Sequence, residues 1–319
     1  MKVSVLVPIY NVEKFIGECA NSLFSQTYSD IEYVFVNDCT PDHSVEALRS
    51  IINKYPERSD SIKIISHEVN KGLAAARNTG VLNAKGDFLF HVDSDDYIKN
   101  DAIEKLVKKA ECTGVDIVDA AFESVDENGN ILHRYDVFRG NKENYIKLLI
   151  SKIVSPTPNI FPRLIRKTLY TKNDIYAIPG INYAEDTMIV PQLLAVGSRD
   201  YIEDSIYYYR VDNPNSYTKD FSVINITSWI LATSQLYQFF TKPEYNSKYG
   251  YYAEIGVLNL MQINHYLVFP DDVGALIPII RPQSVMLRLY MFGLKNQIFY
   301  PISAVIYRML IRKLKKLYE

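Results

Sequence analysis

The stretch FLFHVDSDD, residues 88–96, ends a short apolar run in three carboxylates, Asp93, Asp95 and Asp96. Such a run predicts a buried strand, and charges left unpaired at the end of a buried strand are costly to desolvate. A divalent cation is the most direct counter-charge for them. Because ligands of an α/β sheet bind beyond the carboxyl ends of its strands, the stretch predicts a metal site that faces a phosphorylated ligand. The alternative is a solvated acidic turn that caps the next helix.

Outward from this stretch, strand and helix patterns alternate. Strands are predicted over residues 2–9, 31–36, 62–65, 87–92 and 116–122, and helices over 12–26, 44–55, 73–84 and 102–112. Further along, the patterns indicate a helix over 186–196, a strand over 202–210 and a helical, proline-interrupted chain from about residue 221. The alternation implies parallel strands joined by right-handed crossovers. The predicted fold class is therefore α/β, a mostly parallel sheet flanked by helices, with a helical C-terminal extension.

Composition narrows the functional classes. The 319 residues suffice for one large domain or one domain plus an extension, and the net charge of -2 gives no field that would attract nucleic acid. The cysteines Cys19, Cys39 and Cys112 are odd in number and form no CxxC pair, so neither a disulfide framework nor a zinc site is expected. We expect no signal peptide and no transmembrane helix, and a cytoplasmic location.

The segment from residue 281 to 319 differs in charge from the rest of the chain. It contains eight basic residues and one acid, Glu319. Its apolar residues Ile302, Val305, Ile306, Met309, Leu310 and Leu317 fall at helical spacing, and Arg308, Arg312, Lys315 and Lys316 fall opposite. A basic amphipathic helix of this type lies on an anionic membrane surface. The alternative is a helix docked on its own domain with a solvated basic face.

Four loops that follow the N-terminal strands carry unusual polar residues. They cover residues 8–11, 37–42, 70–72 and 93–96, and Arg77 lies in the helix after the third. Because the carboxyl ends of parallel strands share one sheet edge, these residues should converge there. A nucleoside diphosphate with a metal ion suits this mixture of charges. Gly72, at the start of a helix, could also help to hold an anion.

Together these segments resemble a known family. VSVLVPIYN at 3–11, VND at 36–38, NKG at 70–72, ARNTG at 76–80 and DSDD at 93–96 agree in order and spacing with the family-2 glycosyltransferases. The resemblance covers about residues 1–215. It implies a GT-A fold and an inverting, metal-dependent hexosyl transfer from a UDP-sugar to a hydroxyl of a glycan or lipid-linked acceptor, in surface polysaccharide biosynthesis. It places the catalytic domain in residues 1–220 and leaves 221–319 as a helical region with a basic tail.

The resemblance also implies roles for single residues. Asp38 matches the acid that reads the uracil edge, and Asp93 and Asp95 match the DxD pair, with Asp95 the first choice as direct metal ligand. The metal, Mn²⁺ or Mg²⁺, would act as a Lewis acid on the diphosphate, and hard oxygen ligands suit both ions. The remaining donor-binding residues are Pro8, Tyr10, Lys71, Arg77 and Ser94.

Two later segments also resemble family motifs. The first is YAEDT at 183–187, whose second acid, Asp186, would be the general base that takes the proton of the acceptor hydroxyl. Its alternative is an acidic pair favoured at a helix N-terminus. The second is Tyr209-Arg210, followed by Asn215-Ser216, which matches a Tyr-Arg segment near the diphosphate. Arg210 could instead be a structural ion-pair partner.

Two positions depart from the family pattern. Asn37 stands where many relatives have a first acid, which weakens the assignment of base recognition. His91 occupies a usually apolar strand position and is either near the metal site or, as we favour, a hydrogen-bonded core histidine.

Two other functions compete with the transferase. A sugar-nucleotidyltransferase would need a glycine-rich basic loop after the first strand, which residues 8–11 do not provide. A non-catalytic nucleotide-sugar-binding module would be expected to lose the DxD acids or Asp186, and both are present.

Overall fold

The computed structural model describes residues 1–153, 156–213, 222–267, 271–296 and 299–318. The chain divides into two compact units, and each unit is built from three separate segments. Unit 1 comprises Met1–Val137, Asn159–Asn182 and Val196–Lys219, whereas unit 2 comprises Phe138–Pro158, Tyr183–Ala195 and Asp220–Glu319. The predicted functional division at residue 220 stays a prediction, because this division concerns packing and not activity.

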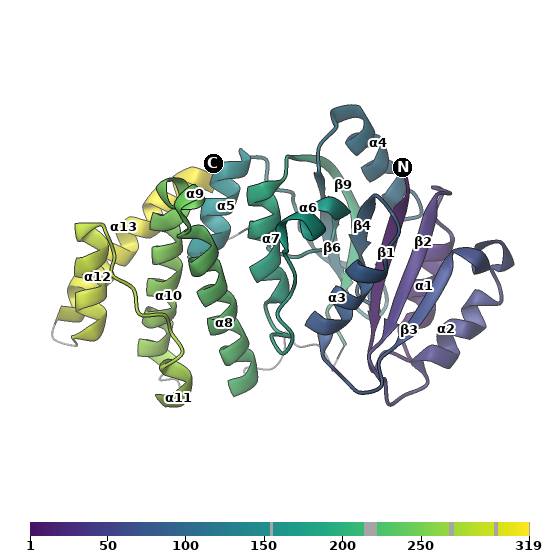
Figure 1. Ribbon diagram of the computed structural model, residues 1–319, viewed down its shortest axis with the longest axis horizontal. Coiled ribbons are helices and arrows are strands. Elements are labelled where there is room, and N and C mark those ends of the chain that lie inside the picture. The colour runs from purple at the N-terminus through teal and green to yellow at the C-terminus, as the bar shows by residue number, and fades with distance from the viewer. Residues whose placement is uncertain (154–155, 214–221, 268–270, 297–298, 319) are drawn as a thin grey trace. The chain divides into compact units, whose positions relative to one another are not determined.

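Unit 1 contains one mixed sheet (Figure 1). Its strand order is β3-β2-β1-β4-β8-β6-β9-β5, and β7 pairs with β6. The first four neighbours in this order are parallel, as the alternating pattern predicts. The strands are β1 (Val3–Ile9), β2 (Ile31–Asn37), β3 (Ile62–Ser66), β4 (Phe88–His91), β5 (Tyr97–Ile98), β6 (Ile117–Val125), β7 (Ile131–Tyr135), β8 (Arg163–Arg166) and β9 (Arg199–Arg210).

Helices cover both faces of this sheet. Alternate residues of β1, from Val3 to Ile9, pack with the apolar side of α1 in the main core, whereas Leu6 faces Gly80 of α3 on the other side. This is the pattern expected of a strand whose side chains alternate between faces. The helices of unit 1 are α1 (Ile16–Phe24), α2 (Ser44–Ile52), η1 (Pro56–Ser61), α3 (Leu73–Asn83), α4 (Ala102–Thr113) and α6 (Lys167–Asn173).

The later part of the sheet differs from a simple parallel alternation. Strand β8 lies between β4 and β6 and is antiparallel to both, and β5 is antiparallel to β9. A buried charge cluster holds three of these strands: Asp119 of β6 accepts hydrogen bonds from Arg163 of β8 and, at 2.5 Å, from Arg199 of β9. Burial alone would raise the pKa of Asp119, but the two guanidiniums lower it below its usual range. The sequence pattern did not predict β8, because only contacts far apart in the chain stabilise this four-residue strand.

Unit 2 is helical, as predicted for the C-terminal region. Its helices are α5 (Lys142–Ser151), α7 (Glu185–Val196), α8 (Val223–Phe240), α9 (Pro243–Tyr245), η3 (Asn246–Gly250), α10 (Tyr251–Leu267), α11 (Asp271–Gly274), α12 (Val285–Lys295) and α13 (Tyr300–Tyr318). Buried residues of α10, α12 and α13 form one apolar cluster. Among the described helices, none is both long enough and apolar enough to cross a membrane.

Candidate functional site

The three acids after β4 have different surroundings. Asp96 is buried, and its carboxylate accepts hydrogen bonds from the Tyr207 hydroxyl at 2.7 Å and from the Arg210 backbone N–H at 2.8 Å. Burial and the charges of Asp95 and Asp93 raise the pKa of Asp96 well above its usual range. Asp96 therefore fixes the acidic segment to β9.

Asp93 and Asp95 are half-buried at the end of β4. The Arg77 guanidinium donates to Asp93 Oδ1 at 2.7 Å, and the Asn213 amide donates to Asp95 Oδ2 at 2.6 Å. Burial, with the charge of Asp93, raises the pKa of Asp95 to about 6. A cation beside Asp95 would offset both of these effects and would therefore be stabilised.

Two carboxylates are hard oxygen donors of the kind that Mg²⁺ and Mn²⁺ accept. Among the described residues, no group of three acidic, histidine or cysteine side chains is arranged to hold a metal ion. The residues present thus fit a metal that is held by one or two carboxylates and whose other ligands come from substrate phosphates. A closed metal site built from the protein alone would not fit.

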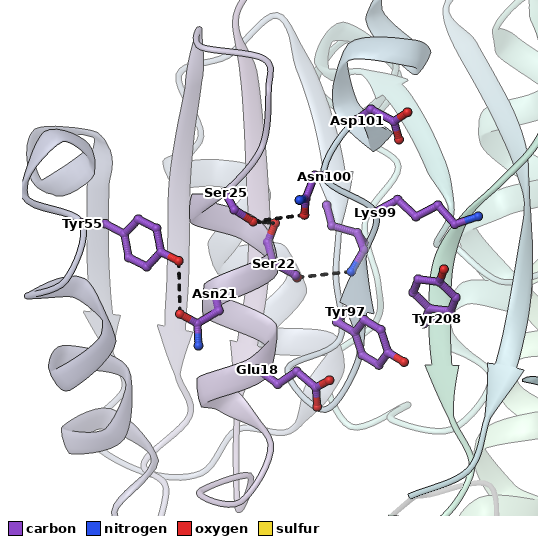
Figure 2. Close-up of a pocket in the computed structure, with 11 residues that line it drawn as sticks. Glu18, Asn21, Ser22, Ser25, Tyr55, Tyr97, Lys99, Asn100, Asp101 and Tyr208 are labelled. Atoms are coloured by element: carbon purple, nitrogen blue, oxygen red, sulfur yellow. Dashed lines mark hydrogen bonds between the residues drawn. The ribbon is translucent and has the colours of Figure 1, made fainter. Parts of the chain in front are cut away.

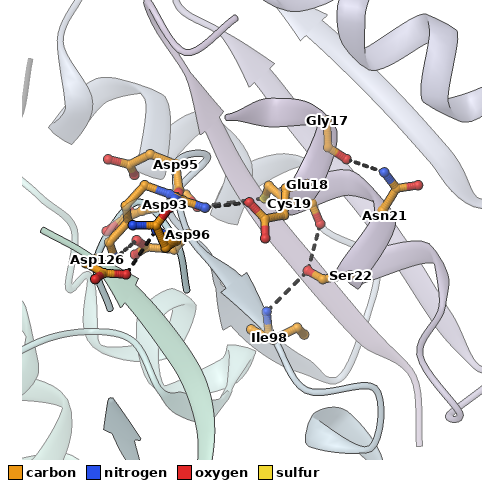
Figure 3. A network of polar contacts seen from close by, with 12 residues as sticks. Gly17, Glu18, Cys19, Asn21, Ser22, Asp93, Asp95, Asp96, Ile98 and Asp126 are labelled. Carbon is orange, nitrogen blue, oxygen red and sulfur yellow. Dashed lines mark hydrogen bonds and ion pairs between the residues drawn. The ribbon is translucent and has the colours of Figure 1, made fainter. Parts of the chain in front are cut away.

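Arg210 connects the acidic segment to α1. Its Nε donates to the Asp95 carbonyl at 3.1 Å, and its guanidinium pairs with Glu18 at 2.5 Å. Figure 3 shows Glu18 beside the acidic segment. The ion pair agrees with the alternative interpretation of Arg210 as a structural partner, and a role near the diphosphate stays a prediction. Asn215 and Ser216, the second part of that motif, lie outside the described residues.

Asp38, which follows β2, organises the loop ahead of α3. The backbone N–H groups of Lys71 and Gly72 donate to its carboxylate at 2.9 and 2.7 Å, and His67 Nδ1 lies 2.6 Å from Oδ1. The residue is only 3% exposed. A carboxylate accepts about four hydrogen bonds, so Asp38 retains room for one more donor. Base recognition would have to use that remaining position.

The start of α3 is already capped by the protein. Gly72 has a φ of 85°, and a Cβ at this position would lie 2.2 Å from the Asn182 amide. Asn182 Oδ1 accepts the Ala74 backbone N–H at 3.2 Å. The amide of Asn182 therefore occupies the helix N-terminus that the sequence suggested for an anion.

The other predicted donor residues lie along the same strand ends. Pro8 is in β1 opposite Val36 of β2, and Tyr10 follows that strand with 43% of its surface exposed. Lys71 is exposed, whereas Ser94 is buried. The structure thus brings Asp93, Asp95 and Arg77 into one polar network.

Asp186 lies in the first turn of α7, in unit 2. Its Oδ1 accepts the Thr187 N–H at 2.6 Å, and the residue is half-buried. This position suits an acid stabilised by the helix N-terminus, and it suits a base as well, because the carboxylate remains partly accessible.

Lys152, which the sequence did not single out, lies near Asp186 in the same unit. Its ammonium donates to the Thr233 hydroxyl at 2.7 Å and lies 5.9 Å from the centre of the Trp229 ring. Burial lowers the pKa of Lys152 to about 7, although the charge of Asp186 acts in the opposite direction. The sequence gives no sign that Lys152 is buried, because it lies in an irregular segment without a recognisable pattern.

Two further residues of the network, Tyr207 and Asn213, were missed. They come from β9 and the chain after it, and each hydrogen-bonds to the acidic segment, as does Arg210, which the sequence had indicated. The tyrosine run 207–209 was a signal for Tyr207, since alternate residues of a strand share one face. Asn213 gives none, because its role depends on how the chain leaves the sheet.

His91 is buried in β4, with Nε2 3.2 Å from the Tyr170 hydroxyl. Burial and the charge of Arg77 lower its pKa well below the usual value, so the ring is neutral. The favoured interpretation as a hydrogen-bonded core histidine agrees with these contacts.

A pocket of about 740 Å³ is lined by Glu18 together with other residues of α1 and of the β5 region. Figure 2 shows tyrosine, amide, hydroxyl and charged side chains in its lining, from α1, the segment after α2, the β5 region and β9. Tyr97 and Tyr208 stack in its wall with ring centres 4.7 Å apart. None of the donor residues predicted from the sequence lines this pocket.

Comparison with known proteins gives glycosyltransferases as relatives. The model of glycosyl transferase family 2 matches residues 4–173. The uncharacterized glycosyltransferase EpsJ of Bacillus subtilis is 35% identical over 222 residues, which are 68% of this chain and 63% of EpsJ. Poly(ribitol-phosphate) beta-N-acetylglucosaminyltransferase TarS of Staphylococcus aureus is 31% identical over 216 residues, 66% of this chain and 35% of TarS. The match thus spans less than two thirds of each relative.

Solved structures of two glycosyltransferases can be superposed on nearly the whole chain. TarS residues 1–349 in complex with UDP-GlcNAc match with a TM-score of 0.65 at 21% identity, covering 98% of this chain and 92% of that one. The mannosyltransferase PcManGT from Pyrobaculum calidifontis, in complex with GDP-Man and Mn²⁺, matches with a TM-score of 0.58 at 16% identity, covering 99% and 84%. At these identities the likeness concerns the fold.

Proposed function

The chain belongs to glycosyl transferase family 2 and has the GT-A fold, and from this membership we propose that it transfers a hexose from a UDP-sugar to a hydroxyl group of a glycan or lipid-linked acceptor. The acceptor would be a precursor of a surface polysaccharide. The proposal is supported by relatives such as TarS, whose name describes transfer of N-acetylglucosamine to poly(ribitol phosphate). The eight basic residues of the segment 281–319 favour an anionic membrane as the surface where that acceptor is met.

One observation carries the proposal. Asp93 and Asp95 lie at the carboxyl end of β4, where Arg77 pairs with Asp93 and the neutral amide of Asn213 donates to Asp95. A sugar diphosphate with a divalent cation would complete this arrangement, because the cation neutralises both the acids and the phosphates. The solved complex of PcManGT with a sugar nucleotide and Mn²⁺ supports this interpretation for a protein of the same fold.

Each residue then has a defined task. Asp95 and Asp93 would hold the cation, which supplies Lewis-acid stabilisation to the leaving diphosphate when it is bound. Arg77 orients Asp93, and Asp38 orients the 70–72 loop beside the donor. Asp186 would accept the proton of the acceptor hydroxyl as that oxygen attacks the anomeric carbon. Attack from the face opposite the diphosphate inverts the anomeric centre.

Calorimetric titration with UDP, with and without Mn²⁺, tests the donor site. We expect Mn²⁺-dependent binding that Asp95→Ala abolishes and that Asp60→Ala, at an exposed acid in η1, leaves unchanged. Asp186→Asn should bind UDP normally but transfer no sugar. Binding that Asp95→Ala leaves intact would remove the assignment of the metal ligand. Donor binding without transfer to any acceptor would favour a non-catalytic binding module.

A further inference from the structure

Helices α12 and α13 pack closely against each other in unit 2. The Ser303 hydroxyl donates to the Tyr290 carbonyl at 3.0 Å, and a Cβ on Gly293 would lie 2.1 Å from Ser303 Oγ. Beside this contact, the rings of Phe292 and Phe299 lie 5.2 Å apart. Close packing of the two helices at a glycine fixes which of their faces point outward.

The apolar residues of α13 divide between two faces. Ile306, Leu310 and Leu314 are buried in unit 2, as the docked-helix alternative supposed. Three others are 44 to 52% exposed and lie at i, i+3 and i+7, namely Ile302, Val305 and Met309. The single apolar face expected from the sequence is therefore two faces, of which only one is covered.

Helix α12 repeats this division. Leu287, Tyr290 and Leu294 are buried, whereas Val285, Leu289 and Phe292 are 48 to 66% exposed at i, i+4 and i+7. The outer apolar face is defined here as the exposed residues Val285, Leu289, Phe292, Phe299, Ile302, Val305 and Met309. Large apolar side chains gathered in this way mark an interaction surface more often than isolated ones do.

Positive charge borders this face. Arg312 and Lys316 are exposed and continue the row of Ile302, Val305 and Met309 at the next two turns of α13. Arg288, Lys295, Arg308 and Lys315 are exposed on the same two helices. Apolar side chains bordered by lysine and arginine match the boundary between headgroups and acyl chains of an anionic bilayer.

We infer that the outer apolar face of α12 and α13 docks on an anionic lipid bilayer, with both helices lying in the plane of the interface. The inference rests on the proposed function only in that a lipid-linked acceptor would lie in the same bilayer. A second copy of the chain suits this face less well, because a symmetric dimer brings the same patch of each copy together and so places like charges opposite each other.

Flotation of the full chain with vesicles tests the inference. We expect binding to phosphatidylcholine vesicles that contain phosphatidylglycerol and at least about tenfold weaker binding to phosphatidylcholine alone. The triple variant Ile302→Ser, Val305→Ser, Met309→Ser should bind the anionic vesicles at least about tenfold more weakly. Its matched control is Val223→Ser, Ile224→Ser, Leu231→Ser, at exposed apolar positions of α8, which should bind like the unchanged chain.

A second variant distinguishes the contribution of charge to vesicle binding from the contribution of the apolar face. Arg312→Gln, Lys315→Gln, Lys316→Gln keeps the apolar face and should lose the preference for phosphatidylglycerol and the sensitivity of binding to salt. Absence of vesicle binding by the unchanged chain overturns the inference, as does equal binding by the Ile302, Val305, Met309 variant. A dimer in sedimentation that this variant dissolves would assign the face to a second copy instead.

UDP binding measures the donor site independently of membrane binding. UDP titration of the same variants should give unchanged affinity, because α12 and α13 contain none of the proposed donor residues. If the unchanged chain binds the anionic vesicles but does not bind UDP, the proposed function is contradicted and the membrane inference is still supported.

Discussion

The ion pair between Arg77 and Asp93 joins a buried guanidinium to a partly exposed carboxylate. Arg77 is 5% exposed and Asp93 is 24% exposed. Arg77→Met leaves the acids after β4 without this counter-charge. We expect it to lower the free energy of unfolding by about 2–3 kcal/mol, below the full value for a buried pair because Asp93 is partly exposed. Urea unfolding measures this loss, and UDP titration should show weaker binding.

A double variant distinguishes charge from packing in this pair. Arg77→Met with Asp93→Asn removes both charges and should recover part of the stability while UDP binding stays weak. Additive losses in the double variant would show that the two side chains do not stabilise each other.

Lys152 gives the chain a testable dependence of stability on pH. Its pKa in the folded protein is about 7, below the value of about 10.4 for an unfolded lysine. Between these values the unfolded chain binds the additional proton, so the free energy of unfolding rises with pH by up to about 1.3 kcal/mol per pH unit. Lys152→Met should therefore be more stable than the unchanged chain at pH 7, by a margin that narrows toward pH 9.

The comparison between two variants isolates this effect. The Cys19 thiol, whose pKa burial and nearby acids raise, is present in all of these proteins and cancels in the difference. Lys147→Met, on helix α5 directly before Lys152, controls for the loss of a positive charge. Parallel pH profiles for Lys152→Met and the unchanged chain would contradict the assignment.

Sequence reasoning at this scale found the residues but not their partners. The expectation that Asp93 and Arg77 lie in one site agrees with the contact between them, because each follows a strand end or opens a helix in a regular βα pattern. The contact of Asp38 with His67, and of Gly72 with Asn182, joins segments through tertiary packing that no local pattern encodes. The donor and catalytic roles of all these residues stay predictions.

At the scale of the element, the start of α3 depends on one glycine. Gly72 combines a φ of 85° with the close approach of Asn182. Gly72→Ala should cost at least about 2 kcal/mol of unfolding free energy, from backbone strain and from displacement of the Asn182 amide. Gly180→Ala is the matched control, since Gly180 has a φ of 91° and nothing within 4 Å of the added Cβ, and it should cost about 1 kcal/mol. Equal losses would show that Asn182 moves aside freely.

The alternating strands and helices of the first 120 residues could be predicted from the sequence, whereas the elements between residues 126 and 166 could not. The strand predicted over 31–36 is observed as Ile31–Asn37, and the helix over 73–84 as Leu73–Asn83. The helix predicted over 12–26 begins only at Ile16, and β7, β8 and α5 were not predicted. These three elements lie in the stretch 126–166, where the chain leaves unit 1 and returns, so their partners are distant in sequence.

For the whole molecule, the segmented units predict how a shortened chain behaves. Helix α5 belongs to unit 2 and packs against α10 and α13. A fragment of residues 1–220 keeps α5 but lacks both partners, and we expect its buried residues Ile146 and Leu149 to become exposed. We expect the fragment to aggregate in size-exclusion chromatography.

Substitution of those side chains should have opposite effects in the two proteins. Ile146→Ser with Leu149→Ser should improve the solubility of the fragment and destabilise the full chain by several kcal/mol. A fragment that is monodisperse and unfolds cooperatively without these substitutions would refute the expected dependence of α5 on unit 2.

The division of the chain into alternating segments also bears on how such proteins diversify. The backbone passes between the two units five times, at 137/138, 158/159, 182/183, 195/196 and 219/220. A single recombination event near residue 220 would exchange most of unit 2 but leave α5 and α7 from the original parent. Hybrids of that kind inherit mismatched helix interfaces, so new specificities in this architecture should arise mainly by point substitution within one lineage and not by exchange of modules.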